Sequence, residues 1–455
     1  MEKEVKKKLF IKSYGCQMNV YDSLKMSELL QPFGYETSDS PDDADMVVLN
    51  TCHIREKAAE KVYSELGRMK AHKEAKKASG SDMIIAVAGC VGQAEGEEIF
   101  KRASCVDIVV GPQSYHNLPT LITEAARKKG KVINLDFAPE PKFDSLMQDT
   151  ASQGVSAFLS IQEGCNEFCK FCVVPYTRGA EFSRPVHEIY RETTKLVSLG
   201  AIEITLLGQN VNGYNGAGLE GEASSLGQLV KYLAKIDQIK RIRYMTSHPR
   251  SMFDDLIEAH GSEEKLMPFL HLPIQSGSDK ILKSMNRKHT VSEYMHTIEK
   301  LLKVRPDMAF SSDFIVGYPG ETDEDFKQTV KIVEDIGYAQ CYSFKYSPRP
   351  GTPASIMENQ VDEKIKSERL AILQEVITSH QEKFNRSSIG KTMEVLFDRT
   401  GKFEGQLLGK SPYMQSVYIN DSSKYHGQLV KVEITQAFQN SLSGIVIDDE
   451  LSKVA

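Results

Sequence analysis

Short apolar runs alternate with longer amphipathic stretches through the first 135 residues of the chain. The runs have the length of buried strands, and helical patterns at 22–33, 55–77 and up to about 102 follow the first three of them. This β-α repetition predicts an α/β domain with a doubly wound parallel sheet. The predicted strands are LFIKSYG (9–15), MVVLNT (46–51), IIAVAG (84–89) and IVVGP (108–112).

The alternation resumes in longer units from residue 155 to about 380. Six strands separated by helical stretches predict a partial (β/α)6 barrel, because a complete barrel would need eight such units. The aperiodic stretch 136–154 contains Pro, Gly and Ser, which indicates a linker before this domain. The six predicted strands are 157–164, 203–210, 241–247, 269–275, 310–320 and 340–346.

The last part of the chain, 385–450, contains closely spaced β-like stretches broken by Gly, Asn and Ser, typical of a small antiparallel β-barrel of the OB-like kind. Residues 383–444 hold eight Lys and Arg against five Asp and Glu, whereas the whole chain has a net charge of -6. A positive module on an acidic body suits polyanion binding, although ordinary surface variation would explain the charge equally well.

The length of 455 residues allows about three domains, which we place at 1–145, 151–382 and 383–448. A composition of 40% hydrophobic and 26% charged residues is that of a globular protein. No apolar run approaches the ~18 residues of a membrane helix, and the start has no signal-peptide pattern. We therefore expect a cytoplasmic protein whose eight cysteines are reduced.

Cys165, Cys169 and Cys172 form a C-x3-C-x2-C motif directly after the first predicted barrel strand. Three thiolates at this spacing can ligate three irons of a [4Fe-4S] cluster. The fourth iron stays open and can chelate the amino and carboxylate groups of S-adenosylmethionine (SAM). The alternative is a structural zinc site, which would need four closed ligands and usually C-x2-C pairs.

Cys16, Cys52 and Cys90 each follow one of the first three predicted strands, in YGC, NTC and AGC. Because the carboxyl ends of parallel strands line one crevice, these cysteines should converge and form a second three-thiolate metal site. The alternative is three buried structural cysteines, since free Cys packs as a small hydrophobe. Cys105 and Cys341 share neither pattern, and we interpret them as structural.

Polar residues end several predicted barrel strands, where they could contact SAM or simply form turns. Two arginines follow the C-x3-C-x2-C motif, and Arg178 and Arg184 could face an anionic substrate or pair with Glu181. The candidate SAM-binding residues are Gln209, Asn210, Ser247, Gln275 and Asp313.

The chain resembles the methylthiotransferase family of radical SAM enzymes over nearly its whole length, and is most similar to the branch that modifies tRNA. The resemblance implies an N-terminal methylthiotransferase domain, a radical SAM core and a C-terminal TRAM domain. The motifs that carry it are YGCQMNVYDS (14–23), NTCHIREKA (50–58), GCNEFCKFCVVPYTRGAEFSRP (164–185), LPIQSGSDKILKSMNRKHT (272–290), DFIVGYPGETDEDF (313–326) and SPRPGTPA (347–354).

The resemblance also implies an activity, namely methylthiolation at C2 of N6-dimethylallyladenosine next to the anticodon of tRNA. It implies two [4Fe-4S] clusters, one on Cys165, Cys169 and Cys172 that cleaves SAM to a radical and an auxiliary one on the other cysteine triad. SAM would be both radical source and methyl donor. The implied partners are a tRNA anticodon stem-loop, a reductant and a sulfur source, with the enzyme a monomer away from membranes.

The TRAM-like module would contact RNA phosphates through basic residues, unless these form only a solvated face. Rival functions remain within and outside the enzyme class. One is methylthiolation of threonylcarbamoyl-adenosine in tRNA or of a ribosomal-protein aspartate. The others are a non-catalytic RNA-binding iron–sulfur protein and a structural zinc protein. The basic residues of the module are Lys391, Arg399, Lys402 and Lys410.

Overall fold

The computed structural model describes residues 6–53, 56–128, 130–137, 142–145, 151–420 and 423–447. Arg55, the predicted start of the second helix, and residue 448, the predicted end of the third domain, lie outside them. The chain forms two compact units. The first comprises Met1–Ala151, Gln162–Phe168 and Cys172–Arg184, and the second comprises Ser152–Ile161, Cys169–Phe171 and Pro185–Ala455.

The first unit is built on one sheet of six parallel strands in the order β2-β1-β3-β4-β5-β6. The four predicted strands are confirmed as β1, β3, β4 and β5. The sequence pattern missed β2 and β6, because their three residues, YET and VIN, include polar positions, whereas the equally short β5 is an unbroken apolar run. The strands are β1 (Lys7–Tyr14), β2 (Tyr35–Thr37), β3 (Met46–Thr51), β4 (Ile84–Gly89), β5 (Ile108–Val110) and β6 (Val132–Asn134).

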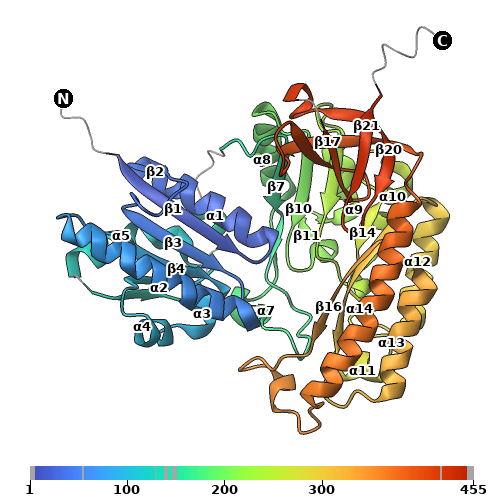
Figure 1. Cartoon of the computed structure of the whole chain (residues 1–455), viewed down its shortest axis with the longest axis horizontal. Coiled ribbons are helices and arrows are strands. Elements are labelled where there is room, and N and C mark those ends of the chain that lie inside the picture. Colours follow the sequence, from blue (N-terminus) through green and yellow to red (C-terminus); the bar gives the residue numbers. More distant parts are fainter. Residues whose placement is uncertain are drawn as a thin grey trace. The chain divides into compact units, whose positions relative to one another are not determined.

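Helices cover both faces of this sheet, as the blue part of Figure 1 shows. Alternate residues of a strand point to opposite faces, so Met46 and Val48 join the core under α1 and α5, while Val47 and Leu49 join the core under α2. All residues of β3 are therefore buried. The helices are α1 (Gln17–Leu30), α2 (Glu56–Ala78), α3 (Cys90–Glu95), α4 (Glu98–Arg102), α5 (Leu118–Lys128) and α6 (Lys142–Ser145).

The second unit contains the six predicted barrel strands, in two parallel three-stranded sheets ordered β13-β10-β7 and β14-β15-β16. This confirms the partial barrel. Each strand ends earlier than predicted, because the polar residues at its carboxyl end belong to the following loop. The strands are β7 (Ser156–Ser160), β10 (Glu203–Leu207), β13 (Arg241–Tyr244), β14 (Phe269–His271), β15 (Ala309–Val316) and β16 (Gln340–Lys345).

Capping residues fix where several barrel helices begin. Thr290 and Glu293 form a reciprocal capping box at the start of α12, and Thr322 and Asp325 form another at α13.

None of the helices in the described part of the chain is long and apolar enough to cross a membrane. The helices of this unit are α8 (Val186–Ser198), α9 (Leu226–Leu233), α10 (Asp254–Ser262), α11 (Asp279–Ser284), α12 (Val291–Val304), α13 (Asp323–Ile336) and α14 (Glu363–Arg386).

The chain continues from α14 into a closed barrel with the strand order β17-β18-β19-β21-β20. Its core consists of apolar residues that alternate along the strands, such as Val395 and Phe397. Four of its five strand pairs are antiparallel, as predicted, and β19 and β21 pair in parallel. The strands are β17 (Thr392–Thr400), β18 (Gln406–Lys410), β19 (Ser416–Asn420), β20 (Leu429–Ala437) and β21 (Leu442–Val446).

Two buried arginines of β13 join the partial barrel to this closed barrel within the second unit. Arg241 donates hydrogen bonds to the backbone oxygens of Lys410 and Glu394, at 2.9 and 2.7 Å. Arg243 donates to those of Ser411 and Pro412, both at 2.8 Å. Because these hydrogen bonds are accepted by backbone oxygens, the junction depends on the main-chain path of the closed barrel.

Glu203 of the neighbouring strand β10 balances this buried positive charge. Its carboxylate accepts from Arg243 Nε at 2.9 Å and lies 3.8 Å from Arg241 Nη1. Burial alone would raise the pKa of Glu203, but the two arginines keep it below its usual range. Glu203 therefore stays ionised in the interior.

Candidate active site

The three N-terminal cysteines lie at the carboxyl end of the first sheet, where neighbouring strands end in register. Tyr14 is paired with Thr51, and Thr51 with Gly89. Cys16 is the N-cap residue of α1, Cys52 follows β3 directly, and Cys90 is the first residue of α3. The strand order reverses between β1 and β3, and such a switch point is where open α/β sheets bind their ligands.

These cysteines contact one another. The side chains of Cys16 and Cys52 hydrogen-bond, and Cys90 is close enough to Cys16 to interact electrostatically. A Cβ atom on Gly15 would lie 2.2 Å from Cβ of Cys52, so only glycine allows this approach. The structure thus brings together the triad that the strand ends predict.

The protonation of the triad depends on its surroundings. The hydrogen bond with Cys52, followed by the positive charge of Arg178, lowers the pKa of Cys16 to about 6. Burial raises the pKa of Cys90, although Arg178 opposes that shift. A thiolate is the form that binds metal, so Cys16 is prepared for ligation near neutral pH.

Arg178 belongs to a buried network of four charged side chains. Its guanidinium bonds Asp22 at 2.7 Å and Glu163 at 2.5 Å. Lys142 lies 2.7 Å from Glu163 and 3.4 Å from Asp22. All four side chains are at most 3% exposed.

Sequence reasoning missed three members of this network. Asp22 is part of the quoted YGCQMNVYDS motif, which was the available signal for it. Glu163 and Lys142 carried no such signal. The stretch 136–154 was predicted to be a linker, yet its α6 supplies Lys142 to the interior of the first unit.

The interpretation of the two arginines after the cysteine motif needs correction. Arg178 is buried and paired with Asp22 and Glu163, so its charge is used inside the first unit and it does not face RNA. Arg184 is also buried, and its guanidinium lies over the ring of Phe143 at 4.9 Å. An exposed phosphate contact does not fit either position.

Cys165, Cys169 and Cys172 lie between β8 (Gln162–Glu163) and α7 (Val174–Arg178), as the motif predicts. The base of this segment is closed by pairing of β8 with β9 (Phe182–Ser183). Gly164 has φ +74°, and a Cβ there would lie 2.0 Å from the carbonyl oxygen of Ala180. The tight start of the cysteine segment therefore requires glycine.

Arg287, which sequence reasoning missed, donates to the sulfur of Cys169 at 3.6 Å. Its other end donates to the backbone oxygen of Pro273, which orients the guanidinium. Within the described residues, no three His, Cys, Asp or Glu side chains converge to hold one metal ion. A cubane does not need that convergence, because each thiolate binds a different iron.

The candidate SAM-binding residues fall into two groups in the second unit. The loops after β10 and β13, which carry Gln209, Asn210 and Ser247, are joined by the bond from Val211 N to Thr246 O at 2.9 Å. The hydroxyl of Ser247 is buried and has no hydrogen-bond partner among the described residues. The Ser247 hydroxyl is therefore available to a bound ligand.

The second group is formed by the loop after β14, which carries Gln275, and by β15, which carries Asp313. Gln275 donates from its backbone N–H to Asp313 O at 3.0 Å. Its φ of +81° is rare for a residue other than glycine and marks a constrained backbone. The carboxylate of Asp313 lies 3.6 Å from Nε2 of His271.

Two histidines near these loops were not predicted. The rings of His248 and His289 are 5.6 Å apart. Burial, followed by the positive charge of Arg287, lowers the pKa of His248 to about 2 and that of His289 to about 3. Both are neutral at physiological pH, and neither ring nitrogen of His289 has a hydrogen-bond partner in the described part of the chain.

The four basic residues predicted to contact RNA differ in their environments. Lys391 and Lys402 are exposed, and Arg399 pairs with its neighbour Asp398 at 3.2 Å. Lys410 is turned inward, since its ammonium bonds the backbone oxygen of Met414 and Oγ of Ser416, and burial lowers its pKa. The prediction of a phosphate contact is therefore wrong for Lys410.

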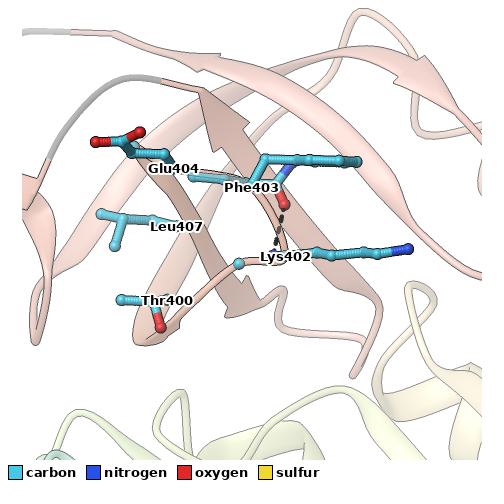
Figure 2. Close-up of a pocket in the computed structure, with 8 residues that line it drawn as sticks. Thr400, Lys402, Phe403, Glu404 and Leu407 are labelled. Carbon is cyan, nitrogen blue, oxygen red and sulfur yellow. Dashed lines mark hydrogen bonds between the residues drawn. The ribbon is translucent and has the colours of Figure 1, made fainter.

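The turn between β17 and β18 presents an aromatic and a basic side chain together. Phe403 is 67% exposed, and Lys402 Nζ lies 5.9 Å from its ring centroid. Figure 2 shows both side chains extending to the same side of the turn. A hollow of about 350 Å³ lies beside them, lined by Thr400, Glu404 and Leu407 among others.

Both cysteine triads fit iron–sulfur ligation by the chemistry of their donors. Each offers three thiols and so leaves one iron of a cubane for another ligand. Arg287 supplies an N–H group to the sulfur of Cys169, and the positive charge of Arg178 interacts with the thiol of Cys90. Hydrogen bonds of this kind tune such clusters.

Three family models match the chain in sequence order. Residues 8–111 match the uncharacterized protein family UPF0004, residues 159–333 match the radical SAM superfamily, and residues 386–447 match the TRAM domain. The fold and these matches define a radical SAM enzyme with an added TRAM domain.

Curated relatives extend over almost the entire chain. A tRNA-2-methylthio-N(6)-dimethylallyladenosine synthase of Rickettsia canadensis (strain McKiel) is 60% identical over 96% of this chain and 99% of its own length. That of Rickettsia felis (strain ATCC VR-1525 / URRWXCal2) is 60% identical over 97% and 100%. The chain belongs to the tRNA-2-methylthio-N(6)-dimethylallyladenosine synthase family.

Solved structures of lower sequence similarity share the fold. The radical SAM methyltransferase TsrM from Kitasatospora setae, solved with cobalamin and a [4Fe-4S] cluster, has a TM-score of 0.56 at 12% identity and covers 77% of each chain. The cobalamin-dependent SAM radical enzyme OxsB has a TM-score of 0.53 at 12% identity, covering 82% of this chain and 56% of its own.

Proposed function

We propose that this chain attaches a methylthio group to C2 of N6-dimethylallyladenosine next to the anticodon of tRNA. The observation that carries the proposal is the presence of two separate cysteine triads in a chain 60% identical to synthases of this kind along its length. One triad supports radical formation, and the other can hold the sulfur. The product is 2-methylthio-N6-dimethylallyladenosine.

Cys165, Cys169 and Cys172 would hold the first [4Fe-4S] cluster and would leave one iron for SAM. When bound, these cofactors supply the radical chemistry needed to activate an aromatic C–H bond, which is too strong for acid–base catalysis. The chain's own contribution is orientation. Arg287 contacts Cys169 from one side, and Ser247 offers a buried hydroxyl to the ligand.

Cys16, Cys52 and Cys90 would hold the second [4Fe-4S] cluster, which would supply the sulfur to be transferred. The contacts among these cysteines and their place at the switch point of the sheet support this assignment. SAM then serves a second purpose as the methyl donor. A reductant supplies electrons, and a separate donor replaces the sulfur.

The closed C-terminal barrel binds the tRNA through Lys391, Lys402 and Arg399, which reach phosphates, and through Phe403, which stacks on an unpaired base. Anticodon-loop bases are unpaired and can be turned out toward a protein, which is the usual mode of sequence-specific RNA recognition. We place this activity in the cytoplasm and in a monomer.

Iron and sulfide analysis of the anaerobically reconstituted protein tests the assignment of the two triads. The wild type should hold about eight irons, and a Cys16/Cys52/Cys90 triple alanine variant about four, because each cubane contains four. The matched variant without Cys165, Cys169 and Cys172 should also hold about four. Eight irons in either variant would contradict the proposal.

Nucleoside analysis tests the reaction. The wild type with SAM, reductant and tRNA bearing dimethylallyladenosine should form the methylthio nucleoside. The Cys16/Cys52/Cys90 variant should still release 5′-deoxyadenosine but form no methylthio product. Methylthiolation of threonylcarbamoyl-adenosine instead would reject the proposed substrate, and failure of the wild type to form 5′-deoxyadenosine would reject the radical chemistry.

A further inference from the structure

Arg178 connects the buried charged network to the cysteines at the end of the first sheet. Its positive charge interacts with the thiols of Cys90 and Cys16. Asn19 adds an indirect link, since its Oδ1 lies 3.5 Å from Arg178 Nη2 and 3.6 Å from the sulfur of Cys16. The guanidinium therefore lies beside the triad.

The network holds this guanidinium in place. Asp22 and Glu163 each accept one of its hydrogen bonds, so its planar fork is fixed at two points. Gln113 donates to the backbone oxygen of Arg178 at 2.7 Å, which fixes the main chain as well. A buried side chain held at three places has little freedom to turn away from the sulfurs.

The charges of the network are balanced before any cluster is bound. Asp22 and Glu163 contribute two negative charges, and Lys142 and Arg178 contribute two positive ones. A cluster on three thiolates adds negative charge beside Arg178, and in a buried site that charge needs a nearby cation or hydrogen-bond donor. Arg178 can provide both.

We propose that Arg178 is a positioning residue of the Cys16/Cys52/Cys90 site, which retains the auxiliary cluster and raises its reduction potential through a positive charge held fixed beside the triad. The inference rests on the proposed function, because it presumes that this triad holds a cluster. The physical reason is that a reduced cluster carries one more negative charge, which a nearby cation stabilises.

The starting protein for the test is the full chain without Cys165, Cys169 and Cys172, so that the auxiliary cluster alone is reconstituted. Two substitutions in this background act in opposite directions. Arg178→Gln removes the cation and should lower the midpoint potential in a redox titration followed by electron paramagnetic resonance. Asp22→Asn keeps a similar side-chain shape but removes a negative charge, so it should raise the midpoint potential.

Retention of the cluster is the second measurement. Loss of iron to a chelator should be about tenfold faster in Arg178→Gln, because the negative charge of the cluster loses its nearby cation. Arg178→Lys keeps the charge and should fall between this variant and the starting protein in both measurements. Arg102→Gln removes an arginine at the surface of the same unit and should change neither.

The outcomes separate the two proposals. If the starting protein takes up no iron, the assignment of the auxiliary cluster fails. If it takes up about four irons per chain but the potentials of Arg178→Gln and Asp22→Asn coincide or shift together, the role of Arg178 is rejected. If Arg178→Gln does not fold, the opposite shifts expected for Asp22→Asn and Arg178→Lys decide the question.

Discussion

The carbonyl oxygen of Ala180 leaves no space for a side chain on Gly164. A Cβ atom built on Gly164 would lie 2.0 Å from that oxygen, and φ at this glycine is +74°. The two residues close the segment that carries Cys165, Cys169 and Cys172. Their approach makes the position of these cysteines sensitive to a single methyl group.

Gly164→Ala should therefore disrupt the cysteine segment and reduce iron bound at Cys165, Cys169 and Cys172 by at least half. The measurement is iron content of the reconstituted variant lacking the other triad. Gly154→Ala is the matched control, because Gly154 also has a positive φ of +81° but no atom within 4 Å of the added Cβ. Equal iron content in both would show that the clash is relieved without loss of the site.

Arg243→Met should lower the free energy of unfolding by about 3 to 5 kcal/mol, as expected when one partner of a buried ion pair is removed. The substitution leaves the backbone oxygens of Ser411 and Pro412 without their donor and weakens the charge balance at Glu203. Urea unfolding followed by circular dichroism gives the value. Lys240→Met, an exposed lysine beside the same strand, should change stability by less than about 1 kcal/mol.

His260 should make the protein less stable as the pH falls. Burial lowers its pKa to about 3, and its Nε2 lies 2.7 Å from the hydroxyl of Tyr244. Between about pH 6.5 and 3 the unfolded chain binds a proton at this histidine and the folded chain does not. Stability should thus fall by about 1.4 kcal/mol per pH unit in this window from this residue alone.

The comparison that isolates this effect is between the wild type and His260→Gln, in urea unfolding at pH 7.5 and pH 5. The difference in stability between the two proteins should shrink at pH 5, because glutamine does not titrate. His296→Gln, at an exposed histidine, should leave a constant difference. A constant difference for His260→Gln as well would contradict the low pKa.

Substitutions in the C-terminal barrel should separate phosphate contacts from stacking. The logarithm of the tRNA binding constant falls linearly with the logarithm of the salt concentration, and Lys402→Ala should reduce the slope of that line by about one unit. Phe403→Ala should weaken binding about tenfold and leave the slope unchanged. Lys410→Ala should leave the slope unchanged, because its ammonium is bonded within the barrel. Fluorescence titrations of an anticodon stem-loop at several salt concentrations give these values.

The sequence predicted those features that depend on local pattern. Strands appear as apolar runs, and a cysteine after each of three strands predicts a convergent triad because parallel strands end at one edge. The buried network around Arg178 has no such pattern. Lys142 and Asp22 are 120 residues apart in the chain, and charged residues in a sequence are ordinarily read as surface. Only the fold reveals that these charges pair.

The same reason explains the errors at Arg178 and Lys410. Arg178 was considered for an anionic substrate because it follows the cysteine motif, and Lys410 for RNA because it lies in the basic module, but each turns inward to oxygen atoms that its own sequence neighbourhood does not predict. In contrast, the short strands β2 and β6 were missed because they include polar positions, unlike the equally short apolar β5. The parallel pairing of β19 with β21 depends on closure of the barrel, which is a property of the whole module.

The junction made by Arg241 and Arg243 has a consequence for how the second unit can diverge. The atoms that accept from these arginines are main-chain oxygens of Glu394, Lys410, Ser411 and Pro412. Every amino acid carries such an oxygen, so a substitution that keeps the main-chain path, for example at the exposed Glu394, can alter the surface of the barrel while its attachment is inherited unchanged. Relatives could thereby adapt to different RNAs without rebuilding the connection to the catalytic core.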